Sequence, residues 1–458
     1  MAPDSVIYFT LRAAARVALR WHYSDILVQG AEHVPLRGPV IVAANHPNAL
    51  VDALLVSVTL ARRVRLTAKA TLFEHSLLAP LLRLVGVVPL HRAKDGRAAK
   101  QSAVPVERNA EAFRVVVSVL RAQGVVLVFP EGISHDAPAL APLRTGAARM
   151  ALEAAAAGIE GVCLLPMGLV FEQKERPRSR VLVRIGEPIA IGATSSHHVA
   201  AVTRTLDDRL RALTLNFATE ERATRAIALA RVLARLGEQA VVIRTPLPLA
   251  DEVVVASRIE AATAALDGAP PELAARADAF VDRVDAFEQR FAGRGVSLLD
   301  LRVSTALAPG ARFVVREGAI LLAGAPIALL GRFTHWLPIR VARALAMRTQ
   351  RSDPSRDQPA MRTIVFGLIL VIGWYLLQAV LVAHWLGPVI AGLWVTVIFI
   401  AARLELRWHE RVGRAARRAR SYLALRRDAP LHRAALVEAA ALLDEAVALE
   451  RMLIGVGP

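Results

Sequence analysis

The sequence predicts an α/β domain, with a mixed and largely parallel sheet flanked by helices, followed by a helical region and a C-terminal transmembrane helical hairpin. Strand-like and helix-like stretches alternate from residue 25 to about residue 192, as in βαβ units. Amphipathic helical patterns dominate residues 197–310, and two long apolar runs follow them. The expected segments are an N-terminal amphipathic helix (1–24), the α/β domain (25–196), a helical region with an interfacial apolar patch (197–345), the hairpin (346–404) and a basic helical tail (405–458).

The composition indicates a protein at an anionic membrane surface and argues against a simple nucleic-acid binder. The 458 residues exceed the usual size of one domain, and they combine a formal net charge of +17 with 55% hydrophobic residues. The single cysteine, Cys163, excludes an internal disulfide and a cysteine metal cluster. It lies in an apolar run, so we expect a small buried side chain in a protein facing a reducing compartment.

The N-terminal segment has no signal-peptide pattern but has helical periodicity. Arg12, Arg16 and Arg20 recur every four residues, and apolar residues occupy roughly the opposite side. Two interpretations remain open on this pattern. The helix either lies on anionic lipid, or packs on its own domain with a solvated arginine face.

A histidine and an aspartate follow the most apolar strand of the α/β domain. Residues 40–44 are predicted to form a strand buried on both faces, and Pro47 suits the first position of the next helix. His46 then lies at the strand end, where α/β proteins commonly place their chemistry. A neutral imidazole can take a proton from a hydroxyl, and Asp52 could fix its tautomer. Residues six apart on a helix point about 240° apart, so the two can meet only if His46 lies in the loop and turns back.

Three further stretches accompany this pair in the same domain. They are residues 86–92 (Gly-Val-Val-Pro-Leu-His-Arg), residues 129–135 (Phe-Pro-Glu-Gly-Ile-Ser-His) and residues 165–168 (Leu-Pro-Met-Gly). In this order, the four blocks resemble those of the glycerol-phosphate acyltransferase family. Five residues separate His46 from Asp52, where most of that family has four. This form resembles the fungal-type glycerol-3-phosphate/dihydroxyacetone-phosphate acyltransferase branch, which also has a helical region and a membrane hairpin.

The resemblance implies a glycerol-3-phosphate acyltransferase-like fold and an O-acyltransferase of phospholipid biosynthesis. Such an enzyme moves a fatty acyl group from an acyl thioester to a hydroxyl of glycerol 3-phosphate or a related glycerol phosphate. His46 and Asp52 would be catalytic, and Glu131 would bind the glycerol hydroxyl or hold Arg92. The residues expected to bind substrate are Arg92, Glu131, Gly132 and Arg144. The implied partners are the lipid bilayer, the glycerol phosphate acceptor and acyl-CoA or acyl carrier protein as co-substrate. Neither a metal nor another cofactor is expected, nor is nucleic acid.

Two other functions remain open. One is the same chemistry with a 1-acylglycerol-3-phosphate (lysophospholipid) acceptor, and the other is a non-catalytic lipid-binding membrane protein of the same fold. A nucleophile elbow at Gly132 lacks its closing glycine, and His135 with Asp136 lacks further metal ligands at suitable spacing. A basic cluster around the second block would receive phosphates of coenzyme A or the acidic face of a carrier protein, or would simply be solvated. Its members are Arg83, His91, Lys94, Arg97 and Lys100.

The membrane prediction depends on two apolar runs and on the arginines around them. Residues 363–383 are long enough to cross a bilayer, whereas residues 389–402 are short unless residues 385–388 are included. Arginines border both outer ends, and the connecting turn has none. This predicts a hairpin with both ends cytoplasmic, in a bacterial inner membrane with the catalytic domain cytoplasmic, rather than two buried core helices. A third apolar patch, residues 318–330, is judged too interrupted to span and is expected to be re-entrant or interfacial.

Overall fold

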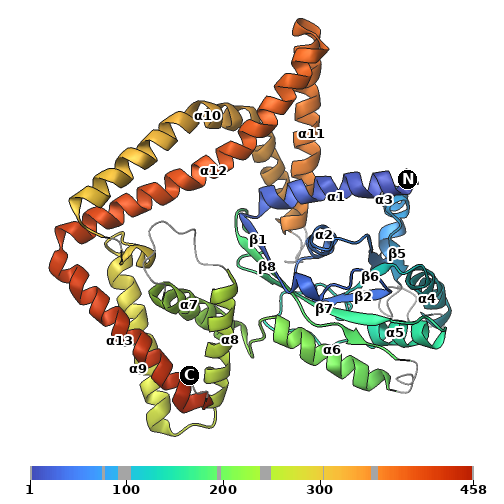
Figure 1. Cartoon of the computed structure of the whole chain (residues 1–458), viewed down its shortest axis with the longest axis horizontal. Helices are drawn as coiled ribbons and strands as arrows, with labels where there is room; N and C mark the ends of the chain where they lie inside the picture. Colours follow the sequence, from blue (N-terminus) through green and yellow to red (C-terminus); the bar gives the residue numbers. More distant parts are fainter. Residues whose placement is uncertain are drawn as a thin grey trace. The chain divides into compact units, whose positions relative to one another are not determined.

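The computed structural model divides the chain into two compact units, which are described separately (Figure 1). The first unit contains residues 1–216 and 347–365, and the second contains residues 217–346 and 366–458. The residues that the structure describes are 3–74, 78–90, 105–192, 198–237, 249–302, 304–351 and 359–455.

A mixed, largely parallel sheet forms the centre of the first unit and confirms the predicted fold class. Its strand order is β1 (Asp25–Gln29), β8 (Arg180–Ile185), β7 (Cys163–Phe171), β2 (Val40–Ala44), β6 (Val125–Val128) and β3 (Val64–Arg65). Only β7 pairs antiparallel among the described strands, with β8 and with β9 (Ile189–Ala190). Two short parallel strands, β4 (Thr67–Lys69) and β5 (Val88–Leu90), form a separate pair. β2 lies between β6 and β7, which makes it the most enclosed strand.

Helices cover both faces of this sheet. Side chains alternate between the two faces along β2, and both faces are apolar. Val42 and Ala44 pack into a cluster with Leu55, whereas Ile41 and Ala43 pack into a second cluster on the other face. In Figure 1, α1 and α2 lie on one side of the sheet and α4 to α6 on the other. The helices are α1 (Pro3–His22), α2 (Leu50–Thr59), α3 (Leu78–Val85), α4 (Pro105–Arg121), α5 (Gly146–Ala156) and α6 (Val199–Leu213), with 3-10 turns at Ala31–His33 and Ala70–Glu74.

The N-terminal helix α1 packs on its own domain. Leu19 is fully buried in the sheet cluster. Arg12 donates hydrogen bonds to the carbonyls of Leu60 and Ala61, and Arg16 donates to the Val58 carbonyl at 3.2 Å. The structure thus favours the second interpretation, with one difference. The arginines are not simply solvated, because they satisfy carbonyls at the C-terminal end of α2, where cations are favourable.

A buried histidine at the end of α1 makes the first unit acid-sensitive. Burial, with the charge of Arg178, lowers the pKa of His22 from 6.5 to about 4. As the pH falls, the His22 imidazole therefore binds a proton in the unfolded chain before it does so in the folded chain. The contribution of neutral His22 to the free energy of unfolding is complete above pH 6.5 and is lost as the pH falls toward 4. Replacing His22 with leucine should remove about 2 kcal/mol of the stability lost between about pH 7 and about pH 5. Denaturant unfolding at the two pH values measures this, and an unchanged loss in the variant would contradict it.

The second unit has a helical core that joins distant parts of the chain. It comprises α7 (Glu220–Gly237), α8 (Leu249–Leu266), α9 (Pro271–Ala292), a 3-10 turn (Leu298–Asp300) and the last helix, α13 (Ala429–Ile454). Phe287 and Phe291 of α9 are fully buried in one apolar cluster with Leu442 and Leu449 of α13. The predicted helical character of residues 197–310 is confirmed where the structure describes them. The prolines at 246 and 248 lie outside the described residues.

Within the residues that the structure describes, three helices of the C-terminal half are long and apolar enough to cross a membrane by length and composition. They are α10 (Leu307–Arg351), α11 (Pro359–Leu386) and α12 (Pro388–Arg427). The apolar patch at 318–330 was judged too interrupted to span, but it lies within α10, which is continuous through Pro326 and Pro338 and is long and apolar enough to cross. Its expected re-entrant or interfacial position stays a prediction. Apolar helices tolerate proline when a neighbouring helix packs against them, as α12 does here. α12 also runs on through the arginine-rich segment, so the expected boundary at 404–405 falls inside a helix.

Candidate active site

The loop between β2 and α2 presents the two residues expected to be catalytic. Pro47 was expected to begin the helix, but α2 begins at Leu50 with Ala49 as its cap. Ala49 has φ +46° and ψ −126°, an uncommon conformation for a residue with a Cβ. Its N–H donates to Ser134 Oγ at 3.1 Å, so a contact from a distant loop holds this turn. The sharp turn at Ala49 brings the loop back over the first turn of α2.

The histidine and the aspartate meet, as the loop geometry requires. His46 Nδ1 lies 2.9 Å from Asp52 Oδ2, and the same oxygen accepts the Asn48 N–H at 2.7 Å. If Nδ1–H donates to the carboxylate, Nε2 keeps its lone pair free to accept a proton. The ring of Phe129 stacks on the imidazole with centroids 3.8 Å apart and planes 9° apart. The carboxylate and the phenyl ring together fix the orientation of the histidine.

Asp52 is completely buried, which strengthens its interaction with the imidazole. Burial raises the pKa of Asp52, whereas the hydrogen bond and charge of His46 lower it. Among the described residues, Oδ1 has no hydrogen-bond partner. Next to it, Tyr23 accepts a hydrogen bond from the Asn48 side chain at 3.0 Å, and burial raises the pKa of that phenol. The carboxylate is therefore stabilised by His46, by the Asn48 N–H and by the positive charge of Lys174.

Glu131 holds the loop that carries His46 in place. It is 3% exposed, and Oε1 accepts the backbone N–H of His46 at 2.8 Å. Oε2 accepts the Ala141 N–H at 2.8 Å and also bonds His135 Nε2. These contacts leave little of the carboxylate accessible to a glycerol hydroxyl, which the family resemblance had implied as its ligand. Glu131 is thus placed as a positioning residue, through which the third block fixes the first.

Three further residues tie the loop down, and sequence reasoning missed them. Ser134 accepts the Ala49 N–H, and the His135 N–H donates to the His46 carbonyl at 3.3 Å. Lys174 donates to the Pro47 carbonyl at 2.9 Å and pairs with Asp136. Ser134 and His135 belong to the third block, so their position could have been inferred from Glu131. Lys174 carries no sequence signal, because it reaches the loop only through the pairing of β7 with β2.

The remaining expected substrate residues differ in what the structure says of them. Gly132 has φ +76°, and a Cβ there would lie 3.4 Å from Arg144 Cγ, so glycine suits both the turn and the close approach. Arg144 is exposed beside it, and its N–H donates to the Pro130 carbonyl at 2.7 Å. This cation is available at the edge of the loop. Arg92 lies outside the described residues, as do four members of the basic cluster, at 91, 94, 97 and 100.

The strained turn gives a direct test of the loop. Replacing Ala49 with glycine should raise the free energy of unfolding by about 1 kcal/mol, because glycine adopts positive φ without a steric cost. Thermal or denaturant unfolding measures the change. The matched control is Ala53→Gly inside α2, where glycine should lower stability by a similar amount. A destabilised Ala49→Gly variant would contradict the strain at this position.

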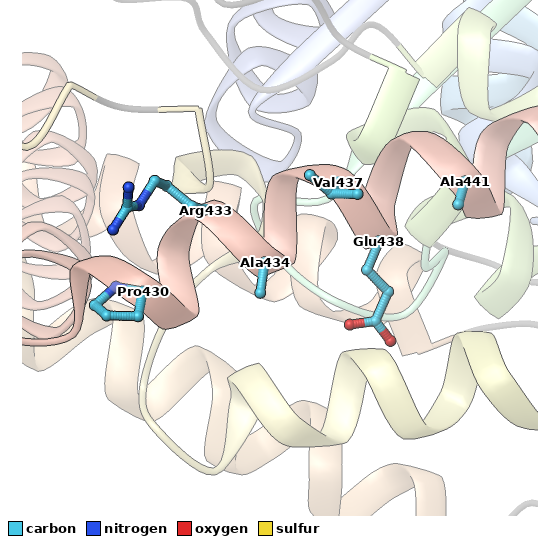
Figure 2. Close-up of a pocket in the computed structure, with 6 residues that line it drawn as sticks. All are labelled: Pro430, Arg433, Ala434, Val437, Glu438 and Ala441. Carbon is cyan, nitrogen blue, oxygen red and sulfur yellow. The ribbon is translucent and has the colours of Figure 1, made fainter.

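A surface hollow along α13 offers no comparable chemistry. Figure 2 shows its six lining residues, all on that helix. The carboxylate of Glu438 is already in an ion pair with Arg290 of α9 at 2.7 Å. The remaining lining includes Pro430, Ala434, Val437 and Ala441, so the hollow has no pair of groups suited to acid–base catalysis. The loop after β2 is therefore the stronger candidate.

Part of the chain is similar to known acyltransferases. The family model described as Acyltransferase matches residues 25–170, the segment that contains the loop, Glu131 and all but the last residue of β7. Over 149 residues the chain is 36% identical to glycerol-3-phosphate O-acyltransferase 2 of Saccharomyces cerevisiae, covering 32% of this chain and 20% of that protein. It is 24% identical over 264 residues to an uncharacterized acyltransferase of Schizosaccharomyces pombe, covering 40% of this chain and 39% of that protein. The crystal structure of the 1-acyl-sn-glycerophosphate acyltransferase PlsC from Thermotoga maritima aligns with a TM-score of 0.36 and 20% identity, covering 46% of this chain and 79% of that one.

The fold and the histidine–aspartate loop define residues 25–170 as an acyltransferase domain. Over this domain, the chain is similar to glycerol-phosphate acyltransferases. The chain spans about a fifth and about two fifths of the lengths of the two curated relatives.

Proposed function

We propose that the protein transfers a fatty acyl group from an acyl thioester to a hydroxyl of glycerol 3-phosphate or a related glycerol phosphate. The observation that carries this proposal is the His46–Asp52 pair at 2.9 Å, held at the end of β2 by Glu131. The donor is acyl-CoA or the acylated form of acyl carrier protein, and no further cofactor takes part. The match to a yeast glycerol-3-phosphate O-acyltransferase supports the acceptor class.

The reaction needs no covalent enzyme intermediate, because a thiolate is a good leaving group. His46 Nε2 accepts the proton of the acceptor hydroxyl while the oxygen attacks the thioester carbonyl carbon. The new C–O ester bond forms, the C–S bond breaks, and the departing thiolate takes the proton from the imidazolium. Asp52 stabilises the imidazolium and keeps Nδ1 protonated throughout. Phe129 holds the ring plane, so the proton is transferred along a fixed direction.

An assay with several donors and acceptors tests this proposal. Purified protein would be incubated with acyl-CoA or acylated acyl carrier protein, each labelled in the acyl group. The acceptor would be glycerol 3-phosphate, dihydroxyacetone phosphate or lysophosphatidate. We expect labelled monoacyl product from one of the two small glycerol phosphates. If lysophosphatidate were the only acceptor to give product, the proposed acceptor would be wrong and the proposed acyl transfer chemistry would stand. Absence of acyl transfer by folded protein with every pair would support the non-catalytic alternative.

Arginines are proposed to bind the acceptor phosphate, since a guanidinium fork matches phosphate geometry. Arg92→Ala should raise the apparent KM for a phosphorylated acceptor about ten- to a hundredfold, the cost of one charge-assisted pair. Arg144→Ala tests the cation that lies beside Gly132 in the same way. Arg149→Ala, an exposed position on α5, is the matched control. Equal losses with an unphosphorylated acceptor would show that neither arginine acts on the phosphate.

The three apolar helices are compatible with membrane association. We propose the finer arrangement from the arginine distribution: α11 and the start of α12 cross a bacterial inner membrane as a hairpin, with both ends cytoplasmic. In a Cys163→Ser background, a cysteine at His384 should react with an impermeant thiol reagent from outside. A cysteine at Arg420 should react only after the membrane is opened. Protection of both positions from outside would contradict a full crossing.

A further inference from the structure

Two helices of the second unit, α10 and α12, pack side by side and antiparallel (Figure 1). A Cβ on Gly331 would lie 2.3 Å from the Ala401 carbonyl oxygen, and one on Gly310 would lie 2.6 Å from the Tyr422 hydroxyl. Between these points, Trp408 donates to the Leu321 carbonyl at 2.9 Å and Arg411 pairs with Glu317 at 2.7 Å. Residues 307–333 of α10 and 403–427 of α12 thus form one layer, named here the two-helix layer.

The helical core limits how many times the chain can cross a membrane. α13 shares a buried apolar core with α7 and α9, and Leu425 at the end of α12 belongs to it. The chain before α10 and the chain after α12 must therefore lie on one side, so an even number of crossings separates them. Three apolar helices cannot all span. Since α11 and the start of α12 form the proposed hairpin, α10 is the helix that does not cross.

The α10 part of the layer nevertheless has a row of exposed apolar side chains, which is unfavourable in contact with water. Its exposed side chains include Val314 at 63%, Leu322 at 78% and Phe333 at 79%. At about 100° per residue, these three fall within about a third of a turn, on a side distinct from the glycines that touch α12. An exposed continuous apolar stripe of this length marks an interaction surface.

The α12 part of the layer is basic on one side. Arg407, Arg414 and Arg417 are exposed and lie within about 80° of one another around the helix, in an arc that also contains the half-buried Glu410. Val412 and Leu423 lie roughly opposite them, and Leu423 is 51% exposed. A helix with arginines on one face and apolar residues on the other is typical of segments that lie in the plane of an anionic membrane interface.

We propose that the two-helix layer lies flat in the cytoplasmic interface of the bilayer and binds anionic phospholipid. The apolar stripe of α10 enters the acyl-chain boundary, and the arginines of α12 attract the lipid phosphates. This inference rests on the proposed membrane hairpin and does not depend on the acyl transfer reaction. It assigns α10 a shallow position, where length and hydropathy alone would have it span.

Depth-dependent quenching in the full-length chain tests the proposal. Single cysteines at Leu322 or Leu329 in a Cys163→Ser background would carry an environment-sensitive fluorophore, with Val380 of α11 as the deep reference. The protein would be reconstituted in vesicles of phosphatidylcholine, alone or in equal mixture with phosphatidylglycerol. Lipids spin-labelled near the headgroup should quench the α10 positions more strongly than lipids labelled deep in the chain. The order should be reversed at Val380.

The arginine contribution has its own matched variants. Arg407→Gln, Arg414→Gln and Arg417→Gln together should lower the interface-bound population on the mixed vesicles, by about fivefold per charge. The control triple of Arg225→Gln, Arg294→Gln and Arg433→Gln removes the same charge from exposed positions elsewhere in the unit and should leave quenching unchanged.

Each outcome decides one part of the proposal. Deep quenching at Leu329, equal to that at Val380, would show that α10 crosses and would overturn the interfacial position. Absence of quenching at both α10 positions would show that protein covers the stripe, which also overturns it. Equal shallow quenching on neutral and anionic vesicles would refute the anionic-lipid preference. Loss of deep quenching at Val380 would instead refute the proposed hairpin. The acyl transfer assay is read separately from all of these.

Discussion

His46→Ala should lower turnover about 10²- to 10⁴-fold, the usual contribution of a positioned general base. The reason is structural: Nδ1 of His46 is committed to Asp52 at 2.9 Å, so Nε2 is the atom left to take the acceptor proton. The initial rate of labelled product formation at saturating acceptor measures the loss. Acceptor KM should change little, because the imidazole acts on the proton and not on the phosphate.

Asp52→Asn is the companion variant. An asparagine keeps the volume but removes the charge that stabilises the imidazolium and the acceptor that fixes the tautomer. Turnover should fall here as well, and the double variant should lose little more than His46→Ala alone, since the two residues act as one unit. Near-normal turnover of correctly folded His46→Ala protein would refute the assignment. Circular dichroism and unfolding curves serve as the folding control.

Glu131→Gln should lower turnover about ten- to a hundredfold while acceptor KM stays near the wild-type value. The carboxylate holds the His46 N–H at 2.8 Å and the Ala141 N–H at 2.8 Å, and an amide cannot accept both sets of donors. A small displacement of the base is costly to rate, because proton transfer depends on alignment. Stability should also fall, since a buried donor is left without its acceptor.

The matched control for this variant is Glu111→Gln on the exposed side of α4, which should behave as wild type. A rise in acceptor KM with unchanged turnover would contradict the positioning role. It would return Glu131 to the substrate contact that the family resemblance implied. The split between KM and turnover is therefore the informative measurement, because loss of activity alone would fit both roles.

The sequence predicts the central part of the fold well, because that part obeys local periodicity. Residues 40–44 form a short β-branched run between turn residues, and the structure makes them the strand β2, buried on both faces. The short strands β3, β4 and β5 were not predicted as such from periodicity. They have two or three residues each, which is too few to show a repeat.

The sequence predicted which two residues form the candidate site, but not the residues that hold their loop in place. His46 and Asp52 carry their chemistry in their residue types, and the condition for their contact follows from helix geometry. The conformation of Ala49 could not be predicted, since alanine disfavours positive φ and a distant serine compensates for it. Lys174 could not be placed either, because its contact with Pro47 requires the pairing of β2 with β7. These supports depend on tertiary structure.

The shared core of α7, α9 and α13 also constrains the order in which the protein can be made. Phe287 and Phe291 are synthesised well before Leu442 and Leu449, which share the buried cluster with them. During synthesis, α10, α11 and α12 are therefore made before the two phenylalanines can be buried against α13. The core is complete only after α13 has emerged. In the proposed topology, this closure requires α13 to be on the same side as α9, so the proposed hairpin would be inserted before the core forms. The last helix thus completes the apolar core of the second unit. A chain released before α13 is made would expose an apolar surface to chaperones and proteases.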